Sequence, residues 1–146
     1  MATQVFINLP VKDLDKSKAF FAHLGYKFNP QFTDENAACM IISDTIYAML
    51  LTEPFFKNFI KKEISNAHKT TEVIVCLSCD SRAKVDEVVK KAVEAGGKTP
   101  VPPQDHGFMY GHGFQDLDGT FGNWSTWIQP TFKNKSAFLP SLGSFL

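Results

Sequence analysis

The sequence has little of what marks several large classes of protein. Its 15 basic and 15 acidic residues give no net charge, and no basic run stands out, which argues against nucleic acid and anionic membranes as partners. The apolar stretches fall far short of a membrane span. The N-terminus, Met1 to Gln4, lacks the basic and apolar regions of a signal peptide. We therefore expect a cytoplasmic protein that binds neither nucleic acid nor membranes.

Recognisable catalytic motifs are also scarce. The sequence contains no phosphate-binding glycine loop, no nucleophile elbow and no zinc-protease motif. It has only three cysteines, Cys39, Cys76 and Cys79. The last two have the spacing of a redox or zinc pair, but they fall in a β-branched run, where residues three apart point to opposite faces of a strand. We interpret all three as small buried hydrophobic residues.

The sequence predicts a strand, a helix and three further extended stretches, and this pattern occurs twice. The first copy opens with a predicted strand at 5–9, followed by a helix that Asp13 caps and Gly25 ends. Turn-forming residues then separate three extended stretches, at 26–33, 37–42 and 46–52.

The second copy begins roughly seventy residues later, which indicates a duplication rather than a solenoid array. It has a predicted strand at 73–78 and a helix that Asp80 or Ser81 caps and the pair Gly96-Gly97 ends. Its extended stretches are 98–101, 108–114 and 120–128, with a hairpin turn at 116–119.

The two copies are joined by a predicted amphipathic helix at about 54–68. Its apolar residues recur at helical spacing, at Phe55, Phe56, Phe59, Ile60 and Ile64. Covering the sheet is the favoured role, and binding a partner or capping a substrate is the alternative. We accordingly divide a single domain, 1–146, into a first module at about 3–53, this linker, a second module at about 70–129 and an atypical tail at 130–146.

Parts of the sequence resemble a known superfamily. The segments FINLPVKDLDKSKAFFAHLGYKF and GFMYGHGFQDLDG are similar to the opening strand and helix, and to a late strand and turn, of the glyoxalase/bleomycin-resistance/extradiol dioxygenase (vicinal oxygen chelate) superfamily. The middle stretch, NPQFTDENAACMIISDTIYAMLLTEPFF, resembles a glyoxalase-like branch of it. The resemblance covers about residues 3 to 119. It implies an α+β fold, with two βαβββ modules forming curved mixed sheets around a cleft.

A divalent metal at the floor of that cleft is the cofactor that the resemblance implies. In relatives, His, Gln or Glu from the first and last strands of each module hold it. Alignment puts Phe6, Leu50, Ile74 and Asn123 at these positions. None of the four carries a strong ligand, so we predict no metal there, although a slip of one or two residues in the alignment would change the ligand set.

Two kinds of function are compatible with the resemblance, because a fold alone does not choose a reaction. The first is a small-molecule lyase, isomerase or dioxygenase, for which Glu72 and His106 are the candidate catalytic residues. The second is a non-catalytic protein that sequesters a small apolar or aromatic compound, as bleomycin-resistance proteins do. In either case a small-molecule cleft is expected to be lined by Phe6, Asn8, Tyr47, Met49 and Tyr110.

A homodimer is a further expectation. The chain has 14 phenylalanines, several of them in the linker and the tail, which is more than one small core obviously needs. Members of the superfamily commonly pair through such surfaces.

The end of the chain departs from the ending that the resemblance implies. Relatives continue after Asp-Gly with a stretch like His-(apolar)-Trp-Glu and stop soon afterwards, whereas this chain continues with Thr120-Phe121-Gly122-Asn123 and runs to Leu146. In the frame that starts on the last base of Gly119, the codons permit His, an apolar residue, Trp and Glu. Codons for Phe132-Lys133 permit a stop in that frame. We hypothesise that a frameshift near Gly119 replaced the usual last strand and its carboxylate.

Overall fold

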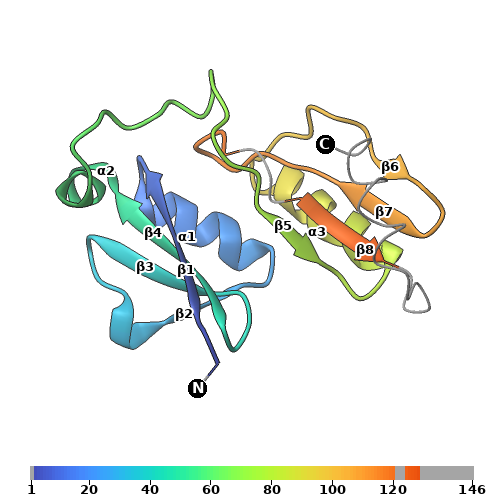
Figure 1. Ribbon diagram of the computed structural model, residues 1–146, viewed down its shortest axis with the longest axis horizontal. Coiled ribbons are helices and arrows are strands. Elements are labelled where there is room, and N and C mark those ends of the chain that lie inside the picture. Colours follow the sequence, from blue (N-terminus) through green and yellow to red (C-terminus); the bar gives the residue numbers. More distant parts are fainter. Residues whose placement is uncertain (1, 121–123, 129–146) are drawn as a thin grey trace.

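In the computed structural model, which describes residues 2–120 and the backbone of 124–128, the first half of the chain forms a four-stranded sheet, sheet A (Figure 1). Its strands lie in the order β1-β4-β3-β2, with β1 parallel to β4 and the other neighbours antiparallel. The elements of this module are β1 (Val5–Val11), α1 (Leu14–His23), β2 (Lys27–Asn29), the 3-10 helix η1 (Pro30–Phe32), β3 (Ala37–Ile41) and β4 (Ile46–Thr52).

The second half of the chain repeats this arrangement in sheet B, whose order is β5-β8-β7-β6. Again the first strand lies parallel to the last, and the other neighbours are antiparallel. The predicted α+β fold of two βαβββ modules with curved mixed sheets is therefore confirmed. The elements of this module are β5 (Cys76–Ser78), α3 (Arg82–Glu94), β6 (Gln104–Asp105), β7 (Met109–His112) and β8 (Trp124–Ile128).

Both long helices begin and end as the sequence predicts. The Asp13 side chain accepts a hydrogen bond from the Lys16 nitrogen at the start of α1. At the start of α3 the Ser81 hydroxyl accepts one from the Lys84 nitrogen, which resolves the choice between two predicted caps. Past the C-terminus of α1, Gly25 has φ 103, a conformation that favours glycine.

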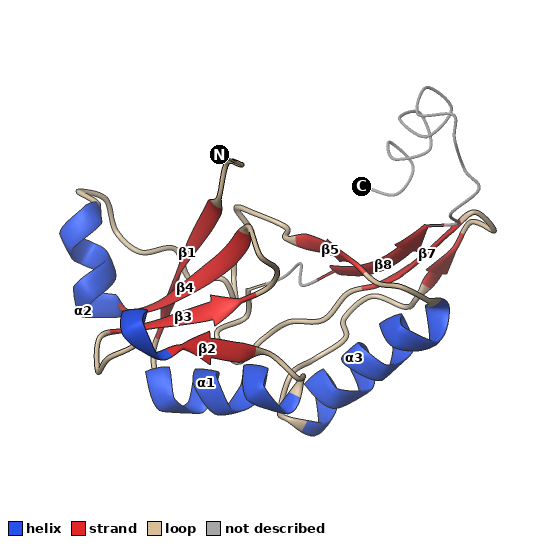
Figure 2. Ribbon diagram, turned by 90° about the horizontal axis from the view of Figure 1, so that it is seen from below, coloured by secondary structure: helices blue, strands red, loops and turns tan. Residues whose placement is uncertain are grey.

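The core lies between the sheets and the two helices, which cover the same side of the molecule (Figure 2). Phe20 and Phe21 of α1 are each 2% exposed and pack edge to face. Phe114, which follows β7, approaches Phe20 with ring centroids 6.3 Å apart. One hydrophobic cluster therefore joins the modules and includes Leu50 of sheet A and Ala92 of α3.

The predicted linker helix is wrong over most of its length. Only the short helix α2 (Glu53–Phe56) and the 3-10 helix η2 (Lys57–Phe59) form, and the chain is extended at Ile60, with φ −131. Helices this short depend on packing for stability. Beyond Phe59 the chain passes from one module to the other and has no continuous sheet surface to pack against, so the helical spacing of its apolar residues is not realised.

The far end of the linker is fixed at the turn that closes sheet B. Asn66 accepts hydrogen bonds from the backbone nitrogens of Lys69 and Thr70, and His68 packs on Gly119. A Cβ atom at Gly119 would lie 2.6 Å from the His68 ring, so only glycine fits there. The linker is thus attached to this turn through His68.

The cysteines differ from the prediction in part. Cys39 in β3 is buried, but Cys76 is exposed and Cys79 is half-buried, because β5 lies at the edge of sheet B. Among the described residues, no helix has the length and apolar character that crossing a membrane requires.

Candidate functional site

Strand alternation divides β1 between two faces of sheet A. Ile7 and Leu9 pack into the core beside α1, so Phe6 and Asn8 point to the other side. We call this side, which faces away from α1, the open face. The parallel register sets Phe6 beside Tyr47 and Asn8 beside Met49. The structure therefore brings four of the five predicted cleft residues together on one surface.

The open face carries an aromatic pair. The rings of Phe6 and Tyr47 stack with centroids 5.0 Å apart and an interplanar angle of 11°. Phe6 is nevertheless 50% exposed. The Tyr47 hydroxyl donates to the Asp44 carbonyl at 3.0 Å, which holds this ring at the end of the strand. Next to the pair, the Asn8 amide donates to the Phe6 carbonyl at 3.3 Å. The result is a flat, partly exposed apolar platform with one amide beside it.

A hollow of about 920 Å³ lies between β1 and the linker, and Asn8 belongs to both this hollow and the open face. We call it the linker hollow. Its walls are mainly apolar, and the polar atoms come from a few side chains. Its lining includes Pro10, Phe56, Ile60, Ile64 and Val73, together with the polar residues Asn8, Glu72 and Thr120.

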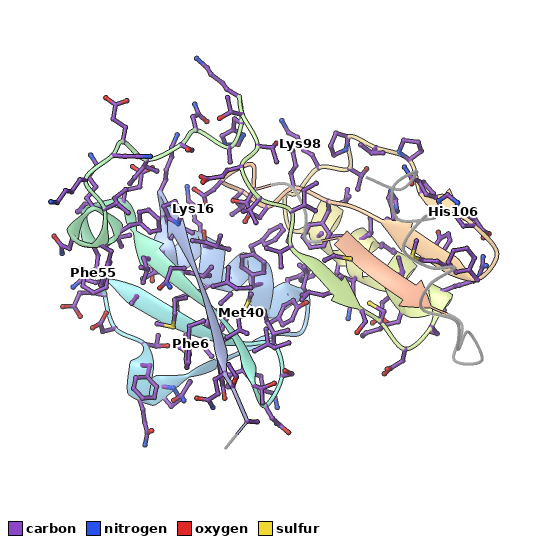
Figure 3. All side chains as sticks on the ribbon, viewed as in Figure 1. Phe6, Lys16, Met40, Phe55, Lys98 and His106 are labelled. Atoms are coloured by element: carbon purple, nitrogen blue, oxygen red, sulfur yellow. The ribbon has the colours of Figure 1, made fainter. Side chains whose placement is uncertain are left out.

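The two predicted catalytic residues lie in different places. Glu72 lines the linker hollow together with Asn8. His106 lies in the turn between β6 and β7, where its backbone nitrogen donates to the Met109 carbonyl at 2.8 Å. That turn is at the opposite end of the molecule from Phe6 (Figure 3). His106 therefore cannot act on a molecule bound in the linker hollow.

Tyr110 also lies away from the open face. Its hydroxyl donates to Asp86 at 2.5 Å, and the Arg82 guanidinium carbon lies 5.3 Å from the centroid of its ring. Both partners belong to α3, so Tyr110 is on the helix-covered side of sheet B. The hydrogen bond to Asp86, with burial, raises the pKa of Tyr110 to about 12. The structure thus corrects the placement of Tyr110 in the cleft and gives it a part in holding β7 against α3.

The residues present do not fit the metal that the fold implies. Leu50, which the alignment puts at a ligand position, is fully buried in the core, because strand alternation turns it toward α1. Its neighbours Met49 and Leu51 lie on the open face. The Met49 sulfur is at best a weak ligand for such a metal, and Leu51 offers no ligand atom. Ile74 is 45% exposed and precedes β5, and Asn123 lies outside the described residues.

Elsewhere in residues 2–120, no three His, Cys, Asp or Glu side chains converge as a metal would require. We therefore derive no chemical step through a metal.

Comparisons with known proteins agree with the fold described above. The family model described as Bleomycin resistance protein-like N-terminal matches residues 3–43. The solved structure of a hypothetical protein, SA1046 from S. aureus, is 30% identical over 88% of this chain and 95% of its own, with a TM-score of 0.70. A glyoxalase/bleomycin resistance protein/dioxygenase family enzyme from Burkholderia phytofirmans PsJN has a TM-score of 0.72.

This chain belongs to the glyoxalase/bleomycin-resistance/dioxygenase (vicinal oxygen chelate) superfamily. The Burkholderia enzyme is 14% identical over 87% of this chain and 99% of its own. A fosfomycin resistance protein, FosX, from Listeria monocytogenes is 15% identical over 91% of this chain and 97% of its own, with a TM-score of 0.60. At such identities the likeness is one of fold alone. No curated protein matches the sequence.

The linker contributes to the site in a way that its sequence does not predict. Phe56, Ile60 and Ile64 line the linker hollow, whereas their spacing predicted a helix over the sheet. Their apolar character indicates that they are covered by something. Which surface covers them depends on where the chain crosses between the modules, and the sequence does not show this.

Proposed function

We propose that this superfamily member binds a small apolar or aromatic molecule without transforming it. The observation that carries the proposal is the exposed Phe6–Tyr47 stack next to the linker hollow. Planar rings bind well on aromatic faces, through dispersion and the quadrupole of the rings. An exposed stack on a face that points away from α1 therefore offers a platform for a planar ligand.

The linker hollow has the size and chemistry of a ligand site. Small-molecule pockets are typically about 300–1,000 Å³, mostly apolar, with a few polar groups that fix orientation. The hollow, at about 920 Å³, lies within that range. Asn8 connects it to the aromatic pair and supplies an amide that both donates and accepts hydrogen bonds. A ligand with its ring on Phe6 would extend past Asn8 under the linker.

A second candidate function is a lyase or isomerase with Glu72 as its base. The position of Glu72 in the wall of the linker hollow favours it, since a general base must reach the bound molecule. Catalytic chemistry would then depend on this carboxylate, and Glu72→Gln would abolish turnover while leaving ligand affinity within about threefold. Binding without turnover in the unaltered protein would favour the first function.

Fluorescence titration with phenylnaphthylamine, an uncharged planar probe, tests the proposed function. We expect saturable binding, weakened about tenfold by Phe6→Ala through loss of stacking and of apolar contact area. Phe32→Ala is the matched control, because Phe32 is 62% exposed but lies in η1 and lines neither the stack nor the linker hollow. The affinity should be the same with a chelator or with added zinc. Equal weakening by both variants, or no saturable binding, would disprove the proposal.

A further inference from the structure

One turn joins three parts of the molecule. It comprises residues 116–120, shortly after β7, and we call it the closing turn. The Asp118 carboxylate accepts a hydrogen bond from the backbone nitrogen of Lys12, just before α1 of module one. The next residue, Gly119, packs so closely on the linker that a Cβ atom there would lie 2.6 Å from the His68 ring. The closing turn therefore holds both module one and the linker against module two.

The side chain of Asp116 organises this turn from inside. Its Oδ1 atom accepts hydrogen bonds from the backbone nitrogens of Asp118, at 3.0 Å, and of Thr120, at 2.9 Å. The Gly119 nitrogen donates to the Asp116 carbonyl at 3.1 Å. Asp116 is only 7% exposed, so its carboxyl group has little contact with water. The conformation of the closing turn, and hence its contacts with module one and the linker, depends on this side chain.

The surroundings of Asp116 favour its protonated form. Both hydrogen bonds to the side chain go to Oδ1, so the other oxygen, Oδ2, is left to carry a proton. Burial, together with the charge of Asp118, raises the pKa of Asp116 to about 7, although the backbone nitrogens of Thr120, Asp118 and Gly119 oppose this shift. Ionised Asp116 adds a second negative charge beside Asp118, with little water to screen it.

Further charged groups meet the closing turn from the elements around it. These are Lys12 and Asp13 before α1, Glu53 of α2, His68 of the linker, and Lys98, whose backbone pairs with that of Gln115. Asp118 is the charged group that acts most strongly on Asp116. Histidine side chains can also change their charge near neutral pH, so an experiment on Asp116 needs a His68 variant beside it.

We propose that Asp116 makes the closing turn a pH-sensitive joint between module two, the linker and the start of α1. The protonated carboxyl group keeps the turn closed. The ionised one lets it open more often, because opening gives the charge access to water. The closed turn binds the proton more tightly than the open one, so this stabilisation is full below about pH 4 and is lost as the pH rises to about 7. Over that range each pH unit raises the open fraction by up to about tenfold.

The joint also bears on the linker hollow, which Thr120 and the last residues of the linker line. A smaller hollow of about 220 Å³ lies between the closing turn and the linker and shares Ala67 and Thr120 with it. When the turn opens, this wall of the linker hollow loses its attachment to module two. A ligand in the hollow is therefore held more tightly in acid than at neutral pH. This last consequence rests on the proposed function, whereas the joint itself does not.

Hydrogen exchange resolved by residue, measured by NMR at several pH values from about 4.5 to 7.5, tests the joint. The reporters are the amides of Lys12, Lys69 and Thr70, whose hydrogen bonds lie at the start of α1 and the end of the linker. Dividing each rate by that of Asp116→Asn at the same pH removes the intrinsic effect of pH, because asparagine accepts the same hydrogen bonds without titrating. We expect this ratio to rise about tenfold or more between pH 5 and pH 7. The ratio for the Gln31 amide, which is bonded locally in η1, should stay constant.

Two further variants are the controls. Asp44→Asn removes an exposed carboxylate elsewhere and should exchange like the unaltered protein. His68→Gln should keep the pH dependence at the Lys12 amide. A constant ratio, an equal change in Asp44→Asn, or loss of the pH dependence at Lys12 in His68→Gln would overturn the joint. If Asp116→Asn does not fold, the Gln31 amide of the unaltered protein supplies the reference rate, and the same rise is expected.

The effect on the linker hollow is tested with phenylnaphthylamine, which stays uncharged over this pH range. It should bind the unaltered protein more tightly at pH 5 than at pH 7, and Asp116→Asn equally at both. Binding that does not depend on pH would overturn the effect on the hollow. A lack of saturable binding together with the expected exchange result would overturn the proposed function and leave the joint standing.

Discussion

The Asp118 carboxylate accepts a hydrogen bond from the backbone nitrogen of Lys12 at 2.9 Å, although 106 positions separate the two residues. Its second oxygen accepts one from the hydroxyl of Ser17 at 3.3 Å, a side chain that is 3% exposed. A single carboxylate in the last described turn of module two thus binds the start of α1 in module one. Its negative charge lies near the positive end of that helix, which is a favourable position.

Removing this carboxylate should loosen the contact between the modules. We expect Asp118→Ala to lower the free energy of unfolding by about 1–2 kcal/mol, through loss of two charge-assisted hydrogen bonds. Chemical denaturation measures the change. Asp44→Ala is the control, since the Asp44 side chain, in the turn before β4, makes no such bond among the described residues. An equal loss in both variants would refute a role for the contact.

Asp116, two residues earlier, should make stability depend on pH. Burial, with the nearby charge of Asp118, raises its pKa to about 7, although the nitrogens of Thr120 and Asp118 donate to it. Since the folded pKa exceeds the unfolded value of 3.8, this group's contribution is full below about pH 4 and is lost as pH rises through about 7. The fall should reach up to about 1.4 kcal/mol per pH unit.

The Asp116→Asn variant isolates this effect, because its amide oxygen can accept the same hydrogen bonds without titrating. The difference in unfolding free energy between the two proteins should grow in favour of the variant from about pH 4 to pH 7. Parallel pH profiles would show that Asp116 does not titrate in this range.

Two glycines with the same backbone conformation should differ sharply when replaced by alanine. Gly119 and Gly107 both have φ 79, but a Cβ at Gly119 would collide with His68, whereas a Cβ at Gly107 meets nothing within 4 Å. We expect Gly107→Ala to cost about 1 kcal/mol through backbone strain. Gly119→Ala should cost a further ~1–3 kcal/mol, because the linker must move. Equal costs would mean that His68 does not pack on the turn.

A homodimer remains the expected assembly. Phe32 and Phe59 are 62% and 68% exposed, in addition to the half-exposed Phe6. Exposed apolar side chains mark an association surface where they gather into a contiguous patch. Light scattering at high micromolar concentration should give twice the chain mass of 16.3 kDa. A mass of one chain under those conditions would refute the expectation.

The gene's nucleotide sequence tests the proposed frameshift directly. The frame that starts on the last base of Gly119 should encode Trp-Glu over the codons of Phe121 to Asn123, followed by a stop near Lys133. A protein made from the restored frame should be shorter and regain a carboxylate where Asn123 stands, an amide that can serve neither as an anionic ligand nor as a general base. Absence of Trp-Glu or of the early stop in that frame would rule the idea out.

Features that depend on neighbouring residues could be predicted from the sequence, and features that depend on distant ones could not. The caps at Asp13 and Ser81 are local, as is the strand at 46–52, and all three were found where expected. The alternation of β1 correctly grouped Phe6 with Asn8. Their meeting with Tyr47 and Met49 depends on how β1 pairs with β4 across some forty intervening residues, and no local feature of the sequence fixes that pairing.

The predicted positions of Leu50 and Tyr110 are wrong for the same reason. The alignment puts Leu50 at a ligand position, but a shift of one residue in register reverses the face of every side chain of a strand, and Leu50 faces the core. Tyr110 was assigned to the cleft because nothing near it in the sequence indicates Asp86 and Arg82, which hold it from α3. Nothing in the sequence near Lys12 or near Asp118 indicates the hydrogen bond between them.

The pairing of β5 with β8 affects how the protein emerges from the ribosome. Sheet A is complete once β4 has been synthesised, so it can form while the rest of the chain is still being made. β5 has a single neighbour, β8, which is made some fifty residues later. Until then β5 lacks its partner strand, and the exposed apolar side chains of Val73 and Ile74 lie just before it. Unpaired strand edges and exposed apolar side chains of this kind are what chaperones and proteases bind. Any change to the gene after Gly119 therefore bears on whether the second half survives quality control, while the first half is already folded.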